Sequence, residues 1–226
     1  MSDLGNRWRQ IQGTALYAYS RLVTRTARFR VEGWEQMEAA EASGRPVLWA
    51  MWHGQLMGFV SFGDRFLENE DFVAVMVGDE RGDTLGMFAR RLRGRVFRVD
   101  MGGNPFAAGR AVLRVIQEMK AGRQSIIAPD GPDGPAFVPK PGVAFLARKA
   151  GAVILPLGVW TRQAYQLRRW DRYLVPTPFA HFHVKIGQPL PAEPQMERET
   201  LLVQIEEVLH AARERAMVLA GARPWR

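Results

Sequence analysis

A single histidine follows the first long apolar run of the chain, and its side chain is the one best suited to acid–base chemistry. His53 comes directly after the run 47–52 and is followed by Gly54 and Gln55. A neutral imidazole can take a proton from an attacking hydroxyl group, so His53 is a candidate general base. The alternative is a structural histidine that caps the end of a strand. Polar segments elsewhere in the chain favour the catalytic interpretation.

A second candidate segment is rich in proline and glycine and reads PDGPDGPAFVPKPG at residues 129–142. Proline fixes backbone torsions and Pro-Asp-Gly steps form turns, so this pattern predicts a rigid loop and not a flexible linker. A rigid loop at the carboxyl end of a strand positions catalytic groups well, and this one carries Asp130 and Asp133. The alternative is a pair of plain consecutive turns.

Several kinds of chemistry are excluded by residues that the sequence lacks. There is no cysteine, so a thiolate nucleophile, a disulfide framework and a cysteine-based zinc site are absent. The sequence also contains no GxSxG, GxGxxG, HExxH or Walker lysine motif. His181 and His183 stand two apart, but neither a cysteine nor a carboxylate cluster accompanies them, and we expect no metal centre.

The candidate residues are separated by apolar runs that alternate with helical patterns. This alternation predicts an α/β fold with a mainly parallel central sheet flanked by helices, in one domain over residues 1–226. The candidate residues would then meet at the carboxyl edge of the sheet. We expect core strands at 47–52, 72–77, 96–99, 125–128 and 152–160, a last strand at an edge at 181–186, and helices that include 105–120 and 195–220.

The first 30 residues predict a basic amphipathic helix, over 7–30. Apolar residues recur at helical spacing, and no acidic residue occurs between Asp3 and Glu32. A helix of this kind, with tryptophan and tyrosine on its apolar side, is typical of a membrane interface. The alternative is a helix packed on the domain with a solvated basic face. The apolar stripe comprises Trp8, Ile11, Ala15, Tyr19, Leu22 and Phe29.

The net charge of +8 calls for a polyanionic partner. No stretch reaches the roughly 20 apolar residues of a membrane span, and the N-terminus lacks the pattern of a signal peptide. We therefore expect a cytoplasmic protein that is peripheral on the inner face of the cell membrane. A nucleic-acid binder is the competing interpretation, but it rests on charge alone because no nucleic-acid motif is present.

Five segments together resemble the lysophospholipid-acyltransferase-like family (domain of unknown function 374), which is related to the glycerolipid acyltransferases. The resemblance covers nearly the whole chain. It implies that a fatty acyl group moves from a thioester, on coenzyme A or an acyl carrier protein, to a hydroxyl group of a lysophospholipid or related lipid in phospholipid biosynthesis. The thioester is a substrate, and no cofactor is implied. The segments are MWHGQ at 51–55, FRV at 97–99, PDGPDGP at 129–135, LPLGV at 155–159 and WDRYLVPTPF at 170–179.

By this resemblance His53 is the catalytic base, but two positions depart from the superfamily pattern. A carboxylate that orients the histidine is expected five residues later, where Gly58 stands, and an arginine that binds the acceptor phosphate is expected where Met101 stands. Gln55, Asp130, Asp133 or Glu80 could orient His53, and we favour Asp130. The backbone N–H groups of Gly131 and Gly134 are candidate oxyanion donors. The expected substrate-binding residues are Gln55, Arg81, Arg110, Gly131, Pro132, Asp133 and Gly134.

The missing carboxylate leaves a second interpretation open. A non-catalytic lipid- or membrane-binding protein on the same fold would need neither a carboxylate at position 58 nor an arginine at position 101. Hydrolysis of the thioester instead of transfer also stays open, because water can take the place of the acceptor. The basic and aromatic segment 162–172 either contacts lipid head groups or packs as a loop.

Overall fold

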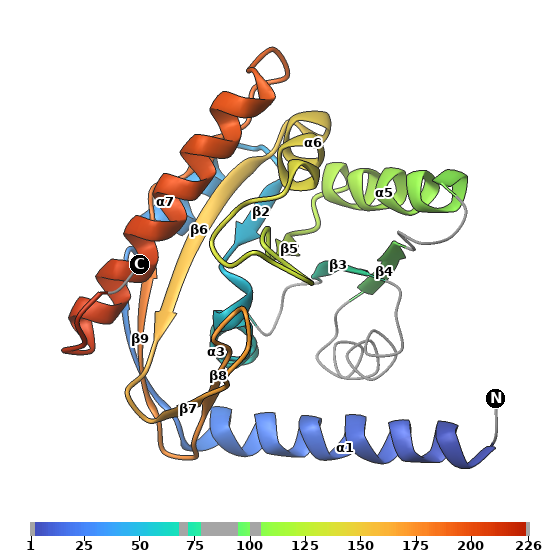
Figure 1. The fold of residues 1–226 in the computed structure, drawn as a ribbon. Coiled ribbons are helices and arrows are strands. Elements are labelled where there is room, and N and C mark those ends of the chain that lie inside the picture. Colours follow the sequence, from blue (N-terminus) through green and yellow to red (C-terminus); the bar gives the residue numbers. More distant parts are fainter. Residues whose placement is uncertain (1–2, 68–71, 78–94, 100–104, 225–226) are drawn as a thin grey trace.

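The computed structural model describes residues 3–67, 72–77, 95–99 and 105–224 of the 226-residue chain (Figure 1). Glu80, Arg81 and Met101 lie outside the described residues, as does segment 85–92, whose apolar spacing also predicts a helix.

A mixed sheet forms the centre of the molecule, and its core is parallel, as predicted. Strand β2 is buried along its whole length and lies between β6 and β5, which explains why it is apolar without alternation. The order of the sheet is β1-β9-β6-β2-β5-β3-β4, and short β10 also pairs with β6. The parallel strands are β2 (Val47–Ala50), β3 (Val73–Val77), β4 (Arg95–Val99), β5 (Ser125–Ile127) and β6 (Val153–Trp160).

The other side of β6 holds strands that run against this core. Strand β9 (His181–Ile186) pairs antiparallel with β6, and β1 (Arg28–Glu32) pairs parallel with β9. The prediction that the strand at 181–186 lies at an edge was therefore wrong, because β1 covers it. Strand β10 (Leu190–Pro191) pairs antiparallel with the first residues of β6.

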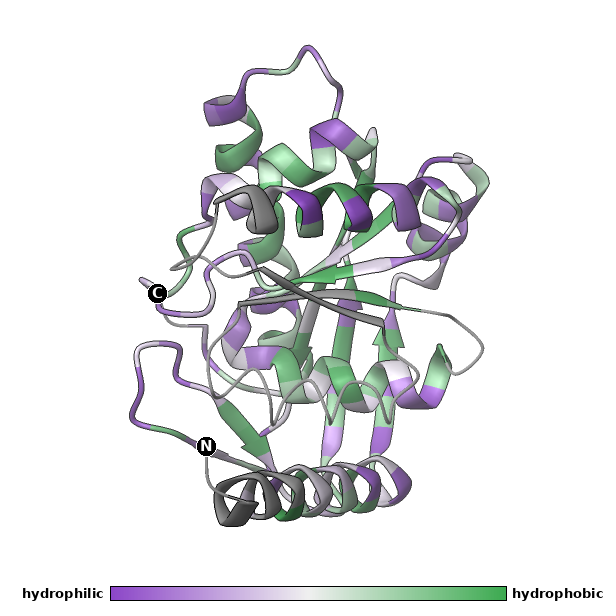
Figure 2. Ribbon diagram, turned by 90° about the vertical axis from the view of Figure 1, so that its right-hand side faces the viewer, coloured by the Kyte–Doolittle hydropathy of each residue, from purple (hydrophilic) through white to green (hydrophobic). Residues whose placement is uncertain are grey.

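Helices cover both faces of the sheet (Figure 1). Successive residues of β2 point to opposite faces, so Leu48 packs in one apolar cluster and Trp49 in the other. The strands between the helices are largely hydrophobic, and the helices carry both hydrophobic and hydrophilic residues (Figure 2). Helices α5 (Pro105–Lys120), α6 (Pro141–Ala150) and α7 (Arg198–Leu219) cover the Leu48 face, and α2 (Trp34–Ala42), α3 (Leu56–Phe66) and the end of α1 (Asp3–Thr26) cover the Trp49 face.

Helix α1 is shorter at its carboxyl end than predicted. It ends at Thr26, because residues 28–32 join the sheet as β1, so Phe29 belongs to a strand. Within α1, Trp8 and Leu22 are exposed, whereas Val23 is buried. No helix among the described residues is long and apolar enough to cross a bilayer.

A small separate hairpin lies beyond the carboxyl end of β6. Strand β7 (Ala164–Gln166) pairs antiparallel with β8 (Leu174–Pro176), and the two form a sheet of their own. The sequence did not predict this hairpin. Strands of three residues are too short to show a period of two.

Candidate active site

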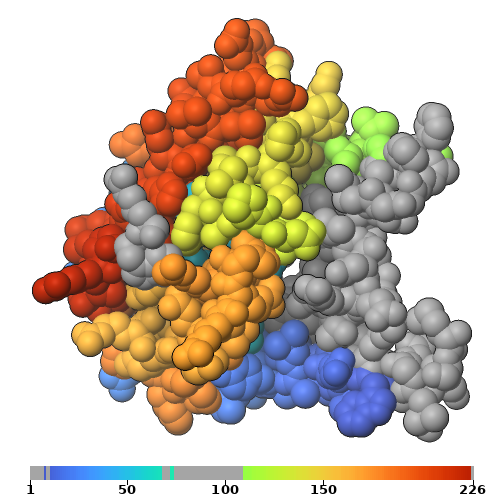
Figure 3. All heavy atoms as spheres, in the orientation of Figure 1, coloured from blue at the N-terminus to red at the C-terminus, as the bar shows by residue number. Residues whose placement is uncertain are grey.

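His53 lies at the carboxyl edge of the parallel strands, where the prediction placed it. It begins a short 3-10 turn, η1 (His53–Gln55), between β2 and α3. The neighbouring strand β5 leads into the loop 129–140, and β6 leads into the β7–β8 hairpin. Both segments reach the histidine. In the space-filling view they lie against each other (Figure 3).

The ring of His53 is held by Asp171, which lies between β7 and β8. The distance from His53 Nδ1 to Asp171 Oδ2 is 2.8 Å. The Asp171 side chain has no exposed surface, whereas 18% of the His53 side chain is exposed. A carboxylate only accepts hydrogen bonds, so it keeps the proton of a neutral imidazole on Nδ1 and leaves Nε2 as an acceptor. Within the described residues Nε2 makes no hydrogen bond, which leaves it available to a substrate.

Asp130 has a different role from the one predicted. Its Oδ1 accepts the backbone N–H of His53 at 2.9 Å, and its Oδ2 accepts the backbone N–H of Phe137 at 3.2 Å. Asp130 therefore ties the rigid loop to the start of η1 and does not orient the imidazole. Burial raises the pKa of Asp130, and the bond from the His53 backbone opposes that rise.

Two glycines explain why the carboxylate comes from Asp171 and not from position 58. A Cβ atom on Gly58 would lie 2.6 Å from Val159 Cγ1 and 3.5 Å from the Phe182 ring, so no carboxylate side chain fits there. A Cβ atom on Gly54 would lie 2.2 Å from the carbonyl oxygen of Asp171. The hairpin can approach His53 this closely because residue 54 has no side chain.

Asp171 is itself held by the hairpin that carries it. Its Oδ1 accepts the Tyr173 backbone N–H at 3.3 Å, and Arg169 Nη2 lies 3.3 Å from Oδ2. The Arg169 guanidinium also lies 5.8 Å from the centre of the Tyr173 ring. Burial, together with the Asp171 charge, raises the pKa of Tyr173 and keeps its hydroxyl neutral.

Aromatic side chains from the hairpin pack beside the imidazole. The ring centres of His53 and Trp170 are 5.4 Å apart, and those of His53 and Tyr173 are 6.0 Å apart. These aromatic residues thus pack as a loop would, while contact of segment 162–172 with lipid head groups stays a prediction. The hairpin also exposes arginines. Those arginines are Arg162, Arg168, Arg169 and Arg172.

The glycines of the rigid loop lie at the site, but not as predicted oxyanion donors. A Cβ atom on Gly131 would lie 2.7 Å from His53 Cδ2, and one on Gly134 would lie 2.6 Å from the Trp170 ring. Both backbone N–H groups are used within the loop, because Gly131 donates to Ala128 and Gly134 donates to Asp130. The prediction that they stabilise an oxyanion was therefore wrong for this conformation.

The remaining predicted residues are less closely joined to His53. Gln55 is buried and donates from Nε2 to the Val159 carbonyl oxygen at 2.8 Å, so it links η1 to β6 and not to the imidazole. Asp133 is exposed, as is Arg110 on α5, and no contact between either of them and His53 occurs in the described part of the chain. Pro132 follows Gly131 in the loop, and as a proline it has no N–H to donate.

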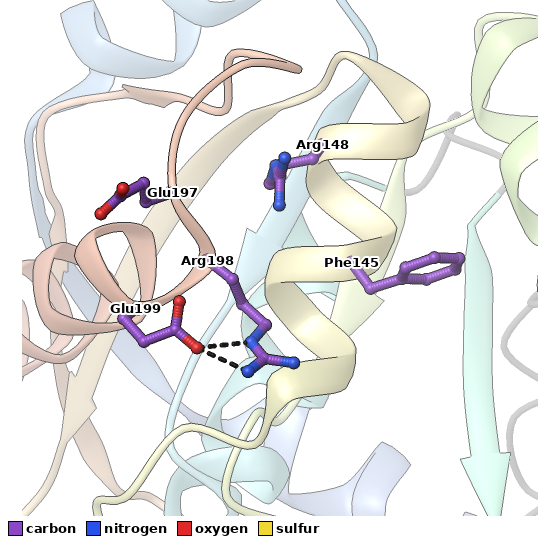
Figure 4. Close-up of a pocket in the computed structure, with 5 residues that line it drawn as sticks. All are labelled: Phe145, Arg148, Glu197, Arg198 and Glu199. Carbon is purple, nitrogen blue, oxygen red and sulfur yellow. Dashed lines mark hydrogen bonds and ion pairs between the residues drawn. The ribbon is translucent and has the colours of Figure 1, made fainter.

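A hollow among the described residues lies elsewhere, between the ends of α6 and α7 (Figure 4). It has a volume of about 500 Å³ and lies at the amino end of β6, since β10 pairs there just before α7 begins. Arg198 and Glu199 form an ion pair in it. Its lining includes none of the residues around His53. The described residues also contain no cluster of carboxylates and histidines that could hold a metal ion.

Comparison with known proteins adds one distant relative. No family model matches the chain. The chain is similar to the uncharacterized protein RP090 of Rickettsia prowazekii, with 24% identity over 176 residues, which are 77% of this chain and 78% of that protein. That name states no activity. The functional argument therefore rests on the residues around His53.

Asp171 is the candidate functional residue that sequence reasoning missed. The segment that contains it was recognised as part of a motif, but its aspartate was not considered as the partner of His53. A signal was present, because Asp171 is an acidic residue among four nearby arginines and follows a tryptophan. Its pairing with a residue 118 positions away is visible only in the fold.

Proposed function

We propose that this protein is an O-acyltransferase, with His53 as general base, that moves a fatty acyl group from a thioester to a hydroxyl group of a lipid. The observation that carries the proposal is the 2.8 Å contact between His53 Nδ1 and the fully buried Asp171 carboxylate. It is the arrangement that an imidazole needs in order to accept a proton at Nε2. The resemblance of five sequence segments to lysophospholipid acyltransferases selects the substrate class.

The reaction follows from this geometry in two proton transfers. As the acceptor oxygen attacks the thioester carbonyl carbon, Nε2 of His53 takes the hydroxyl proton and a tetrahedral oxyanion forms. The carbon–sulfur bond then breaks, the ester carbonyl is restored, and the imidazolium returns the proton to the leaving thiolate. Asp171 accepts the hydrogen bond from Nδ1–H throughout and stabilises the imidazolium between the two steps.

The donor is acyl-coenzyme A or an acyl carrier protein, and the acceptor is a lysophospholipid or a related lipid. Such an acceptor is presented at a membrane, so we also propose that the protein works on the inner face of the cell membrane. The net charge of +8 supports an anionic surface as its location. The loss of the carboxylate at position 58 was the main support for a non-catalytic lipid-binding protein. Asp171 weakens that alternative, because it offers a carboxylate from another segment.

The experiment that tests the proposal measures free thiol released from acyl-coenzyme A and acyl-carrier-protein donors. Each donor is supplied with and without mixed lyso-lipids on liposomes. We expect turnover that depends on a lyso-lipid, and a decrease of about 10²- to 10⁴-fold in His53→Ala. His181→Ala is the matched control, because His181 is an exposed histidine on β9, outside the contacts around His53.

Three outcomes would contradict the proposal. Unchanged turnover in His53→Ala would remove His53 as the base. No turnover with any donor, while wild type and variant bind liposomes equally, would favour the non-catalytic protein. Turnover without a lipid acceptor would identify a thioesterase instead.

A further inference from the structure

Large exposed apolar side chains occur on two segments that are far apart in the sequence. On α1, Trp8 is 63% exposed and Ile11 is 58% exposed. Tyr165 on β7 is 65% exposed, and Phe179 in the turn after β8 is 71% exposed. We call these four residues, together with the 49% exposed Leu22 of α1, the apolar face.

Two hydrogen bonds join the segments that carry the apolar face. The Tyr19 hydroxyl of α1 donates to the Pro176 carbonyl oxygen of β8 at 2.6 Å. The Phe179 backbone N–H donates to Thr26 Oγ1, at the end of α1, at 2.9 Å. The end of α1 and the hairpin lie side by side at the lower end of the molecule in Figures 1 and 3. The hairpin and the carboxyl end of α1 are therefore joined, and the earlier turns of α1 extend away from the hairpin along the same lower end of the molecule (Figure 1).

Helix α1 turns these side chains away from the domain. At 3.6 residues per turn, Trp8, Ile11 and Leu22 fall on one side of the helix. The opposite side carries the buried residues of α1, which are mostly small or polar: Gly13, Ser20, Val23 and Thr24. The helix thus packs on the domain with its less apolar side. Tyr19, on the same side as Trp8, packs against the core, but Trp8, Ile11 and Leu22 face solvent, which is the reverse of what folding of the domain alone would favour.

Phe179 is exposed in spite of a costly backbone conformation. Its φ angle is 65°, in the left-handed region that a residue with a Cβ atom rarely adopts. The hydrogen bond to Thr26 fixes the backbone here and presents the ring to solvent. Such conformations persist where the surrounding contacts fix them, and they cluster at functional sites, including ligand clamps.

Exposed arginines beside the apolar face indicate the chemistry of its partner. Arg25 and Arg28 lie at the end of α1 and the start of β1, and Arg162 and Arg168 lie on the hairpin segment. Aromatic and aliphatic side chains bordered by arginine suit a bilayer whose head groups are anionic, because the rings enter the interfacial region while the guanidinium groups bind phosphate. An apolar protein partner would not need this border.

We propose that the apolar face docks on an anionic lipid bilayer, and that the hairpin which carries Asp171 is part of the docking surface. Tyr165 pairs with Val175 across the hairpin, and Asp171 lies in the segment between them. The lipid surface and the His53–Asp171 pair therefore share one small element, which brings the base close to an acceptor held in the bilayer. This use of the surface rests on the proposed function, but the docking itself does not.

The test is binding to phosphatidylcholine vesicles that contain phosphatidylglycerol, measured by sedimentation without any thioester. We expect Phe179→Ser and Trp8→Ser each to weaken binding about tenfold, because each removes a large aromatic side chain from the interface. Binding should also weaken at high salt and with vesicles of phosphatidylcholine alone. Phe145→Ser is the matched control, since Phe145 is 49% exposed on α6, at the other end of the sheet, and should leave binding unchanged.

Vesicle binding and thiol release separate this proposal from the proposed function. Tight binding that needs Phe179, without any turnover, would retain the docking surface and refute the acyltransferase. Equal binding of Phe179→Ser, Trp8→Ser and wild type would overturn the docking surface, as would an equal loss in Phe145→Ser. A dimer in analytical ultracentrifugation that both variants abolish, without a change in vesicle binding, would assign the face to a second copy of the chain.

Discussion

Replacement of Asp171 by asparagine should impair the base by more than the loss of one hydrogen bond. The Tyr173 backbone N–H binds Asp171 Oδ1, so the amide oxygen of the variant should stay on that side. Its NH₂ group would then face His53 Nδ1, where the imidazole donates in the wild type. Two donors cannot bind each other, so we expect the imidazole proton to move to Nε2. In that tautomer Nε2 cannot take the acceptor proton.

The size of the effect has two parts. A lost hydrogen bond to a charged group costs about 1.5–3 kcal/mol, which corresponds to roughly 10- to 150-fold in rate. The wrong tautomer adds to this, and in hydrolases with a histidine–aspartate pair the same substitution costs about 10⁴-fold. We therefore expect Asp171→Asn to lower kcat by about 10²- to 10⁴-fold with little change in KM, because Asp171 acts through His53 and is fully buried.

Thiol release and nitrogen NMR of the histidine ring test this prediction together. The spectra should show a protonated Nδ1 in the wild type and a protonated Nε2 in Asp171→Asn. Asp133→Asn is the matched control, because Asp133 is an exposed aspartate in the loop next to His53 and should keep both the rate and the tautomer. A fully active Asp171→Asn, in a protein where His53→Ala is inactive, would refute the role of Asp171.

Two further predictions concern stability. Gly58→Ala should lower the free energy of unfolding by about 1–3 kcal/mol, since its Cβ would lie 2.6 Å from Val159 Cγ1. Urea unfolding measures this loss of stability. A double variant, Gly58→Ala with Val159→Ala, that recovers none of the lost stability would contradict this account. The hydrogen bond from Arg215, assisted by Lys185, lowers the pKa of Glu32 from 4.5 to about 2, so its contribution is present above pH 4.5 and is lost as the pH falls towards 2. Glu32→Gln should therefore have a lower urea midpoint than the wild type at pH 7. If the difference between the two urea midpoints did not become smaller below pH 4.5, the result would count against this linkage.

The parallel core and the place of His53 were predictable because both depend on local patterns. Strands β2 and β6 are buried almost throughout, so their sequences are apolar without interruption. A polar residue directly after such a strand must lie at the carboxyl edge of the sheet. The glycine after His53 and the turn-rich loop after β5 gave further local signals, and the structure brings both to the site.

The roles of individual carboxylates were not predictable from the same patterns. The sequence places Asp130 in a rigid loop but does not show that its oxygens accept the backbone N–H groups of His53 and Phe137. It also does not show that Val159 fills the space beside Gly58. Both facts depend on which segments pack together over long separations. The edge position assigned to the strand at 181–186 failed for the same reason, because its partner β1 stands at the other end of the chain.

The distance in sequence between His53 and Asp171 has a consequence for how activity arises as the chain folds. His53 follows β2, the first strand of the parallel core. Asp171 lies 118 residues later in the chain, beyond β6, so it can reach His53 only after β6 has paired with β2. Closing so long a loop is entropically costly and tends to come late. A chain that has assembled its core but not its hairpin holds a histidine with no partner on Nδ1. The proposed base would thus become competent only when the hairpin has docked, which would tie the proposed acyl transfer to completion of the fold.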